Sequence, residues 1–320
     1  MFGARRSTRT CAVALAIGAL SAIGSGPGSA QTSEPGWLQI VNAYRTSTGL
    51  PRLTEDPTWM TGVSKHAIYL AMTGSMVHGE DPSSPFYTPD GAAAAEKSVL
   101  GGWRGSVRSD RDLIDGWMTS PFHAIHFFEP RLQRIAFAST RGTPGASLDS
   151  SAVLDVVHGL GSKVVADRPV TFPANASTTP LTTFVAETPN PLTSCPGYSA
   201  PAGLPLLALF PNAPGNATAY LTTDGRAVET CLIDIGYVNP DADAQRTARS
   251  LLTQKNAVII VPRLPLQPGA TYTARVATAA AGTVEWSFTV QAEGGVLPGP
   301  STSPVALYPP VKALALRPKK

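Results

Sequence analysis

The stretch LIDGWMTSPFHAIHFFEPRLQRI, residues 113–135, decides the fold of the first half of the chain. Its first six residues favour a helix, because apolar side chains recur there at three- and four-residue spacing. Ser109, followed by Asp112 three residues on, predicts a capped start for that helix. The Ser-Pro step at residues 120–121 predicts its end, since proline disfavours helical geometry in the residue before it. We therefore expect a turn, rather than a helix face, to present His123.

A second pattern lies nearer the start of the chain. Apolar spacing predicts a helix over residues 35–48 and another over residues 57–73. The sequence GLPRL, residues 49–53, separates them. Taken together, the segment from Leu38 to Asp56 reads L-x-x-x-N-x-x-R-x-x-x-GLP-x-L-x-x-D.

This segment and the pattern Trp-x-x-Ser-Pro-x-His of residues 117–123 resemble the signature segments of the cysteine-rich secretory protein, antigen 5 and pathogenesis-related (CAP) superfamily, in its bacterial form. The resemblance covers roughly residues 34–165 and implies an α+β fold, a three-layer α-β-α sandwich. It also implies that Asn42 and Arg45 tie the first helix to neighbouring loops. Two strand-like runs would supply the central strands of the sheet: residues 133–140 and 152–159.

The same resemblance implies a cleft lined by titratable side chains. Residues 75–105 read as loop-rich, with a short Ala-rich helix near 92–99, because prolines and an Asp-Gly turn interrupt any long element. His78 stands where the family has its first cavity histidine, and His123 is the second. Glu96 matches the acid of the family's Gly-Glu-Asn element, although the flanking Gly and Asn are absent.

The second acid of the family's cleft is missing after the tryptophan of the third helix. Glu80 and Asp115 are candidate replacements, although neither stands at the matching position. Of the remaining polar side chains, His126 is expected to pack among apolar neighbours. Ser120 lacks the sequence context of a catalytic nucleophile.

Two neutral imidazoles and one carboxylate can bind Zn²⁺ or another divalent cation, with a water in the fourth position. His78, Glu96 and His123 are therefore the predicted metal- and ligand-binding residues, and no residue is assigned to catalysis. The alternative is that both histidines are hydrogen-bonded and only hold the loops together.

The first thirty residues predict export. Arginines precede an apolar run over residues 12–23, and small residues before Gln31 offer a cleavage site, so residues 1–30 read as a signal peptide. Three of the 25 basic residues and none of the 22 acidic ones lie there, which leaves 22 against 22 and a net charge near zero. That balance argues against a nucleic-acid binder, which usually has a basic face. No later apolar run approaches the roughly 20 residues of a membrane helix.

The second half changes in composition near Asp167, becoming rich in Pro, Thr, Ala and Gly. Short strand-like runs separated by turn residues predict a β-sandwich over residues 185–292, interrupted by a helix over residues 242–254. Its last hairpin, residues 265–290, resembles that of an immunoglobulin-like bacterial domain. Residues 293–320 read as a Pro-rich basic tail.

The predicted mature chain has two cysteines, Cys195 and Cys231. An even pair in an exported chain most simply forms one disulfide. Metal binding by the pair is the weaker alternative, because no CxxC motif or nearby histidine cluster supplies further ligands.

We therefore predict a secreted CAP-domain protein that is extracellular or associated with the cell envelope. Its function is predicted as a non-enzymatic binding module for a small apolar ligand, a divalent cation or a cell-envelope component. The alternative is a metal-assisted extracellular peptidase that uses His78, Glu96 and His123. A third hypothesis, a purely structural role in cell-wall attachment, also remains. The sequence does not indicate an oligomeric state.

Overall fold

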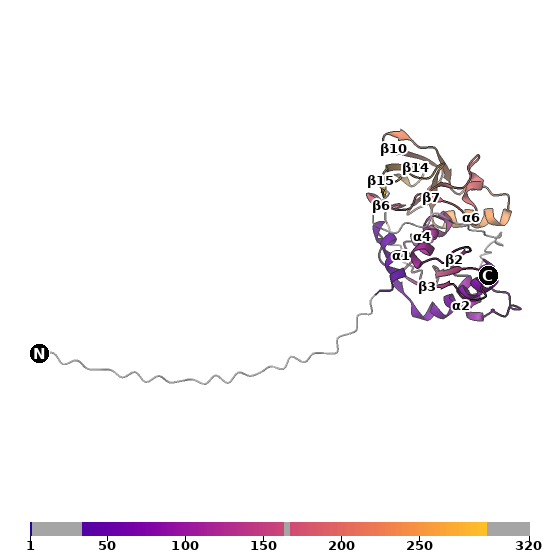
Figure 1. Ribbon diagram of the computed structural model, residues 1–320. Coiled ribbons are helices and arrows are strands. Elements are labelled where there is room, and N and C mark those ends of the chain that lie inside the picture. Colours follow the sequence, from indigo (N-terminus) through magenta and orange to yellow (C-terminus); the bar gives the residue numbers. More distant parts are fainter. Residues whose placement is uncertain (2–33, 163–166, 293–320) are drawn as a thin grey trace. The chain divides into compact units, whose positions relative to one another are not determined.

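The first half of the chain is built around a four-stranded sheet with the order β1-β3-β4-β2 (Figure 1). The computed structural model describes Met1 and residues 34–162 and 167–292. The predicted signal peptide and tail thus lie outside the described residues. The strands are β1 (Thr54–Glu55), β2 (Ser98–Trp103), β3 (Arg134–Arg141) and β4 (Ser150–Asp155). The helices are α1 (Gly36–Ser47), α2 (Met60–Thr73), α3 (Pro89–Ala95), α4 (Asp110–Met118) and α5 (Pro121–Phe127).

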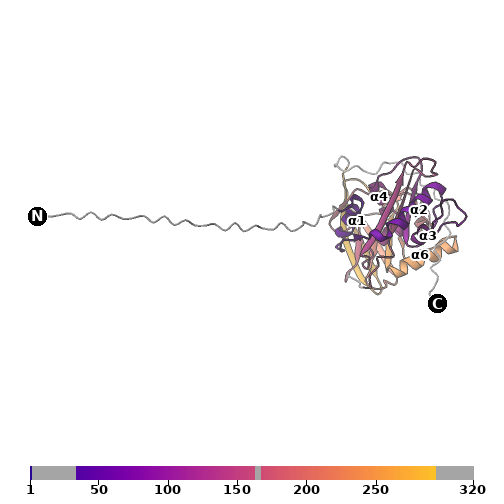
Figure 2. The ribbon, with the colours of Figure 1, turned by 90° about the horizontal axis from the view of Figure 1, so that it is seen from below.

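Helices cover both faces of this sheet. Phe137 and Leu154, which are paired on β3 and β4, share a core with side chains of α1, α4 and α5. The preceding residues, Ala136 and Val153, face the other way and share a core with α2 and α3. Figures 1 and 2 show α1 and α4 on one side of the strands and α2 on the other. The predicted three-layer α-β-α sandwich is confirmed.

Two local predictions around α4 had different outcomes. The capped start is confirmed, because the Ser109 hydroxyl accepts a hydrogen bond from the Asp112 N–H, and the Asp112 carboxylate accepts one from the Ser109 N–H. The turn predicted at His123 is wrong, because His123 is the third residue of α5. Pro121 does separate the two helices, yet it occupies the first position of the second one, where its missing N–H is not needed.

Strand β2 was missed in the segment interpreted as loop-rich. All six of its residues are buried, so it shows no alternation between apolar and polar side chains. Its two glycines also resemble turn signals in the sequence. Gly101 is required by packing, since a Cβ there would lie 2.4 Å from the ring of Trp103.

Asn42 and Arg45 have the structural role that the resemblance implies. The Asn42 side chain bonds both the N–H and the carbonyl of Leu53. Arg45 is fully buried and donates to four backbone carbonyls, those of Pro51, Phe127, Glu129 and Leu132. Burial lowers the pKa of Arg45 to about 10, which leaves the guanidinium charged at neutral pH. Helix α1 is thereby fastened to the turn that follows α5.

The second half is rich in β-structure. One sheet has the strand order β11-β10-β14-β15-β6, a second has β12-β13-β9-β5, and β7 pairs with β8. The strands are β5 (Val170–Phe172), β6 (Ser177–Thr179), β7 (Thr183–Phe184), β8 (Ala202–Gly203), β9 (Leu206–Leu209), β10 (Ala217–Thr223), β11 (Arg226–Ala227), β12 (Thr230–Ile233), β13 (Ala257–Pro262), β14 (Thr271–Thr278) and β15 (Gly282–Val290). The helix predicted over residues 242–254 is present as α6 (Ala242–Gln254). We call residues 167–292 the β-rich region, and its immunoglobulin-like character stays a prediction.

The predicted disulfide is confirmed. Cys195 and Cys231 are joined, with their Cα atoms 5.7 Å apart. The bond links the end of a short 3₁₀ helix, Pro191–Ser194, to strand β12. It therefore lies wholly within the β-rich region.

The two halves share one hydrophobic core. The ring of Phe172 on β5 contacts those of Tyr44 on α1 and Phe128 after α5, with centroids 5.9 and 5.1 Å apart. Phe122 on α5 contacts Tyr237 of the β-rich region, with ring centroids 5.4 Å apart. From Pro35 onward the described residues form one compact unit. The division into a domain over 34–165 and another over 185–292 remains a prediction, and strands β5 to β7 already pair within the β-rich region before residue 185.

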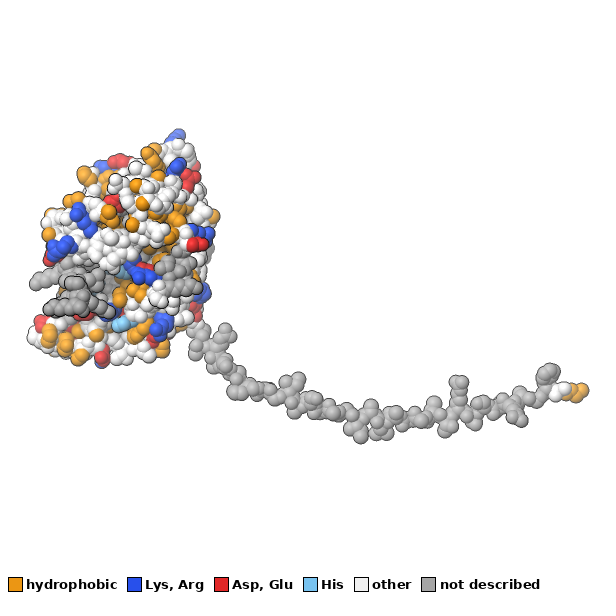
Figure 3. Space-filling view, turned by 180° about the vertical axis from the view of Figure 1, so that it is seen from behind, with side chains coloured by type: hydrophobic (Ala, Val, Ile, Leu, Met, Phe, Trp, Pro, Cys, Tyr) orange, Lys and Arg blue, Asp and Glu red, His pale blue; other side chains and the backbone are white. Residues whose placement is uncertain are grey.

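The face of the molecule in Figure 3 shows no single dominant charge. On the face in Figure 3, Lys and Arg side chains are scattered among acidic and hydrophobic ones. Within the residues that the structure describes, no helix is long and apolar enough to cross a membrane.

Candidate functional site

His123 is held by a carboxylate from the β-rich region. Ser120, the residue before α5, provides no side-chain cap. Instead, Oε1 of Glu187 accepts from the backbone N–H of His123 at 2.8 Å and from its ring Nδ1 at 2.6 Å. The Glu187 side chain is fully buried, whereas 20% of the His123 side chain is exposed. Because Nδ1 donates to the carboxylate, Nε2 is the nitrogen with the free lone pair in the neutral ring.

Glu187 is itself in an unusual environment. Burial raises the pKa of its carboxyl, although the hydrogen bond and charge of His123 oppose that rise. Among the described residues, its second oxygen, Oε2, has no hydrogen-bond partner. Buried carboxylates are usually fully hydrogen-bonded, so this side chain depends strongly on its contact with His123.

His78 is oriented in a similar way. It lies in the loop between α2 and α3, and its Nδ1 is 3.0 Å from the backbone carbonyl of Ala95. A carbonyl only accepts, so Nδ1 is protonated and Nε2 again has the lone pair. Burial lowers the pKa of His78 to about 4, and the charges of His123 and His66 lower it further. His78 is therefore neutral at physiological pH, and it lies close enough to His123 for the two rings to interact.

Glu96 does not join these histidines. It is exposed and follows the last residue of α3 as the C-cap. Within residues 34–162 and 167–292, no group of three or more His, Cys, Asp or Glu side chains is placed to hold a metal ion. The predicted set of His78, Glu96 and His123 is therefore not among such groups, and Glu96 is exposed at the end of α3. A metal site with three protein ligands does not fit these side chains.

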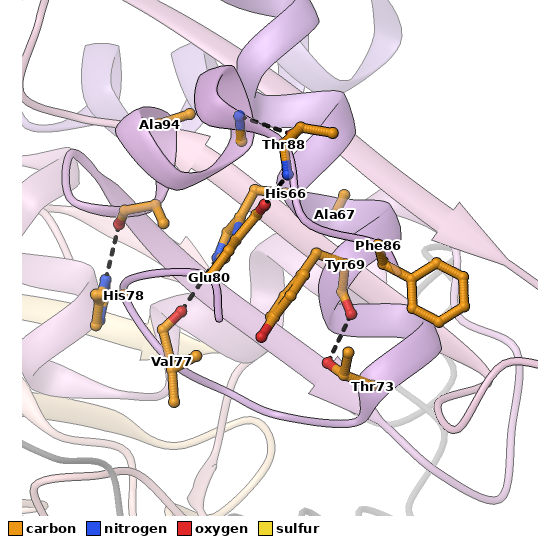
Figure 4. A network of polar contacts seen from close by, with 12 residues as sticks. His66, Ala67, Tyr69, Thr73, Val77, His78, Glu80, Phe86, Thr88 and Ala94 are labelled. Carbon is orange, nitrogen blue, oxygen red and sulfur yellow. Dashed lines mark hydrogen bonds and ion pairs between the residues drawn. The ribbon is translucent and has the colours of Figure 1, made fainter. Parts of the chain in front are cut away.

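Glu80 is not available as a replacement ligand (Figure 4). Its Oε1 contacts Nδ1 of His66 at 3.0 Å, and its Oε2 accepts from the backbone N–H of Thr88 at 2.7 Å. Nε2 of His66 is 3.1 Å from the carbonyl of Val77. His66 thus binds residues on both sides of His78, and this network holds the loop that presents it.

Asp115, the other candidate replacement, is also engaged. It is buried on α4, and its Oδ1 accepts from the Tyr44 hydroxyl at 2.6 Å. Burial raises the pKa of Asp115, and the Tyr44 hydrogen bond opposes the rise. The pair joins α4 to α1, so its role is structural.

His126 is closer to the site than its sequence environment suggested. Burial lowers its pKa well below the usual value, and the charges of Lys255, His123 and His78 lower it further. Lys255 belongs to the β-rich region, and its Nζ contacts Oε2 of Glu129 at 2.5 Å. The charges of His78 and His123 thus act on His126, and we call these three rings the histidine cluster.

Sequence reasoning missed Glu187 because it lies 64 residues beyond His123. One signal was available, since Glu187 is the sole charged residue between positions 169 and 223. A lone acid in such a segment has no local partner, so a distant one was to be expected.

Comparisons with known proteins agree with the first half of the chain. The model of the cysteine-rich secretory protein family (CAP) matches residues 38–154. No curated protein matches the chain. The crystal structure of selenomethionine PcoC, a copper resistance protein from Escherichia coli, is similar over 38% of this chain and 95% of its own, at 18% identity and a TM-score of 0.20. A score of that size supports no argument.

The matched residues include His78 and His123, the buried Asn42 and Arg45, and the four strands of the sheet except Asp155, the last residue of β4. Residues 38–154 are thus a domain of the cysteine-rich secretory protein (CAP) family.

Proposed function

We propose that this CAP-domain protein is exported and acts as a non-enzymatic binding module, with the histidine cluster as its binding site. The observation that carries the proposal is that the rings of His78 and His123 have the same hydrogen-bonding pattern. Each ring has Nδ1 bound to an acceptor, and neither Nε2 has a partner within the described residues. Such rings are fixed in orientation and tautomer, which is how proteins prepare imidazoles as ligands.

The ligand class that this chemistry favours is a borderline divalent cation such as Zn²⁺. Neutral imidazole is the form that coordinates metal. Burial lowers the pKa of His78 to about 4, so its ring is neutral at any pH well above that value. Two imidazoles would leave the remaining coordination positions to water or to donor groups of a second molecule. That arrangement suits reversible binding of a cation or of a molecule that chelates it.

A hydrolase is less well supported by the same residues. Metal-assisted hydrolysis usually has three protein ligands and a free base. Glu96 is exposed, Glu80 is bound to His66 and Thr88, and Oε1 of Glu187 is occupied by His123. Of the three carboxylates, Glu187 alone is bonded to a ring of the cluster, and its one unpartnered oxygen, Oε2, is buried.

The test is a titration of the metal-free full chain with ZnCl₂ in a calorimeter. We expect His78→Ala and His123→Ala each to weaken zinc affinity by about tenfold or more, since loss even of an orienting partner has effects of that size. His158→Ala is the matched control, because that ring also bonds a carboxylate, Asp155, but lies outside the cluster. Equal affinities for all four proteins would refute the proposed site.

A second measurement separates binding from catalysis. The zinc-loaded chain and its His123→Ala variant are incubated with a broad peptide library. We expect no turnover by either protein. Cleavage by the unmodified chain that is lost in the variant would instead favour the hydrolase alternative.

A further inference from the structure

A concavity lies where residues 38–154, which we call the CAP part, meet the β-rich region. Its volume is about 190 Å³. The turn after α5 contributes Glu129 and Arg131, and the β-rich region contributes Arg168 and Lys255, together with Val170 and Leu209. We call this concavity the junction pocket. Pockets for drug-sized ligands usually measure about 300–1,000 Å³, so the junction pocket suits a smaller molecule.

Positive charge exceeds negative charge in the junction pocket. Three cationic side chains line it, Arg131, Arg168 and Lys255, and Glu129 is the one acidic side chain among its lining residues. Glu129 is shared, since its Oε1 accepts from Nε of Arg131 at 2.8 Å and its Oε2 from Nζ of Lys255 at 2.5 Å. These contacts hold the pKa of Glu129 at about 2 despite its burial. One carboxylate thus offsets only one of three positive charges.

The excess charge is partly removed from water. The side chain of Lys255 is 6% exposed and that of Glu129 is 5% exposed. A buried cation is costly unless it is paired, and here its partner is already bound to Arg131. An additional anion would relieve that cost.

Helix α6 ends at this pocket, and the carbonyls of a helix C-terminus disfavour anions. Two of those carbonyls are capped, because the N–H of Lys255 bonds the carbonyls of Leu251 and Thr253. The N–H of Asn256 also bonds the carbonyl of Thr253. The ammonium of Lys255 adds a full positive charge at the same end. The pocket therefore retains its preference for negative charge.

One wall of the junction pocket is apolar. Val170 on β5 and Leu209 on β9 are paired strand neighbours that line it, and both are buried. We propose that the junction pocket binds a small organic oxyanion, with its carboxylate or phosphate near Arg131, Arg168 and Lys255 and a short apolar body against Val170 and Leu209. This inference does not depend on the proposed function, since none of the three histidines of the cluster lines the pocket.

The test uses the metal-free full chain at low ionic strength, with sodium benzoate, sodium acetate and inorganic phosphate titrated separately. We expect benzoate to bind more tightly than acetate, because only its ring can cover the apolar wall. Arg168→Ala should weaken benzoate binding by about fivefold, the effect of one charge at about 4 Å in water. Arg168 is exposed, so its removal should leave the fold intact. Arg226→Ala, which removes another exposed cation from β11, is the matched control and should not change benzoate affinity.

Glu129→Gln gives an independent test in the opposite direction. It removes the internal counter-charge, so the affinity for benzoate and for phosphate should rise about fivefold or more. A gain in anion affinity cannot be mistaken for an effect of misfolding. Tighter binding of phosphate than of benzoate would identify a free inorganic anion as the ligand and overturn the apolar contribution. Undetectable binding of all three probes, or equal binding by the unmodified chain, Arg168→Ala and Glu129→Gln, would overturn the proposal.

Discussion

Two histidine–carboxylate pairs in this molecule have similar chemistry and different surroundings. His66 and Glu80 lie in the first half, 14 residues apart, and both side chains are fully buried. His123 and Glu187 come from different halves, and the His123 ring is partly exposed. In the first pair both ring nitrogens are bonded, whereas in the second only Nδ1 is. The number of free ring nitrogens separates a ring that holds a loop from a ring that can take a ligand.

The comparison also shows how the two halves depend on each other. The first pair fixes the loop that contains His78, and the second fixes His123 from outside the CAP part. The binding site proposed above thus needs the β-rich region for the orientation of one of its two rings.

Breaking the fully buried pair should have the largest effect on stability. His66→Ala leaves the Glu80 carboxylate buried with only the Thr88 N–H as a partner. Removing one member of a buried pair costs about 3–5 kcal/mol, and we expect that loss in the free energy of unfolding, measured in urea. His123→Ala should cost less, about 1–3 kcal/mol, because Glu187 retains its backbone hydrogen bond. Equal losses of unfolding free energy in His66→Ala and His123→Ala would show that the two histidine–carboxylate pairs contribute equally to stability.

The disulfide should come next. Cys195 and Cys231 are separated by 36 residues, and replacing both by Ala should lower stability by roughly 3–4 kcal/mol on the chain-entropy model. Because Cys195 lies eight residues after Glu187 in the same region, zinc affinity at the histidine cluster should also fall. The His66 network lies in the other half, so hydrogen exchange of the Thr88 N–H should be changed only through global unfolding. Faster local exchange at Thr88 would show that the two pairs are coupled.

Much of the fold could be predicted because its signals are local. The Ser109–Asp112 capping box, the end of α2 at Gly74 and the bounds of α6 each depend on a few neighbouring residues. Of the proposed site residues, His123 was predicted from a short motif, and His78 from its position in the family resemblance.

The acidic partners could not be predicted in the same way. Glu96 was chosen by position along the chain, yet it is exposed as the C-cap of α3. Glu80 and Glu187 were placed by contacts across 14 and 64 residues, which no spacing rule covers. Strand β2 was missed because a fully buried strand with two glycines lacks alternation.

The pH dependence of stability should report on His78. In the folded chain the pKa of His78 is about 4, below the usual value of 6.5. Between pH 6.5 and 4 the unfolded chain therefore binds a proton at this ring that the folded chain does not bind. This contribution is fully present above pH 6.5 and is lost as pH falls toward 4. We expect His78→Asn, whose amide can still donate to the Ala95 carbonyl, to flatten the profile by roughly 1–2 kcal/mol, a reduced figure because the ring is only half-buried. His158→Asn, at a more exposed ring, is the control. An unchanged slope between pH 6.5 and 4 would show that His78 is not kept neutral by burial.

Glu187→Gln should have the smallest effect on stability and the most specific effect on binding. The amide oxygen can still accept from the His123 N–H, so α5 keeps its cap, but a neutral amide no longer fixes the Nδ1–H tautomer as firmly. We expect zinc affinity to fall about tenfold, equivalent to about 1.4 kcal/mol, with a change in unfolding free energy below that figure. Glu80→Gln is the matched comparison, because it alters the other pair: it should cost more stability and less affinity. If both variants lost stability and affinity in the same proportion, the two pairs would have one common structural role. If Glu187→Gln lost more zinc affinity and Glu80→Gln lost more stability, the result would show that Glu187, a residue outside the CAP part, orients the ring that binds the ligand.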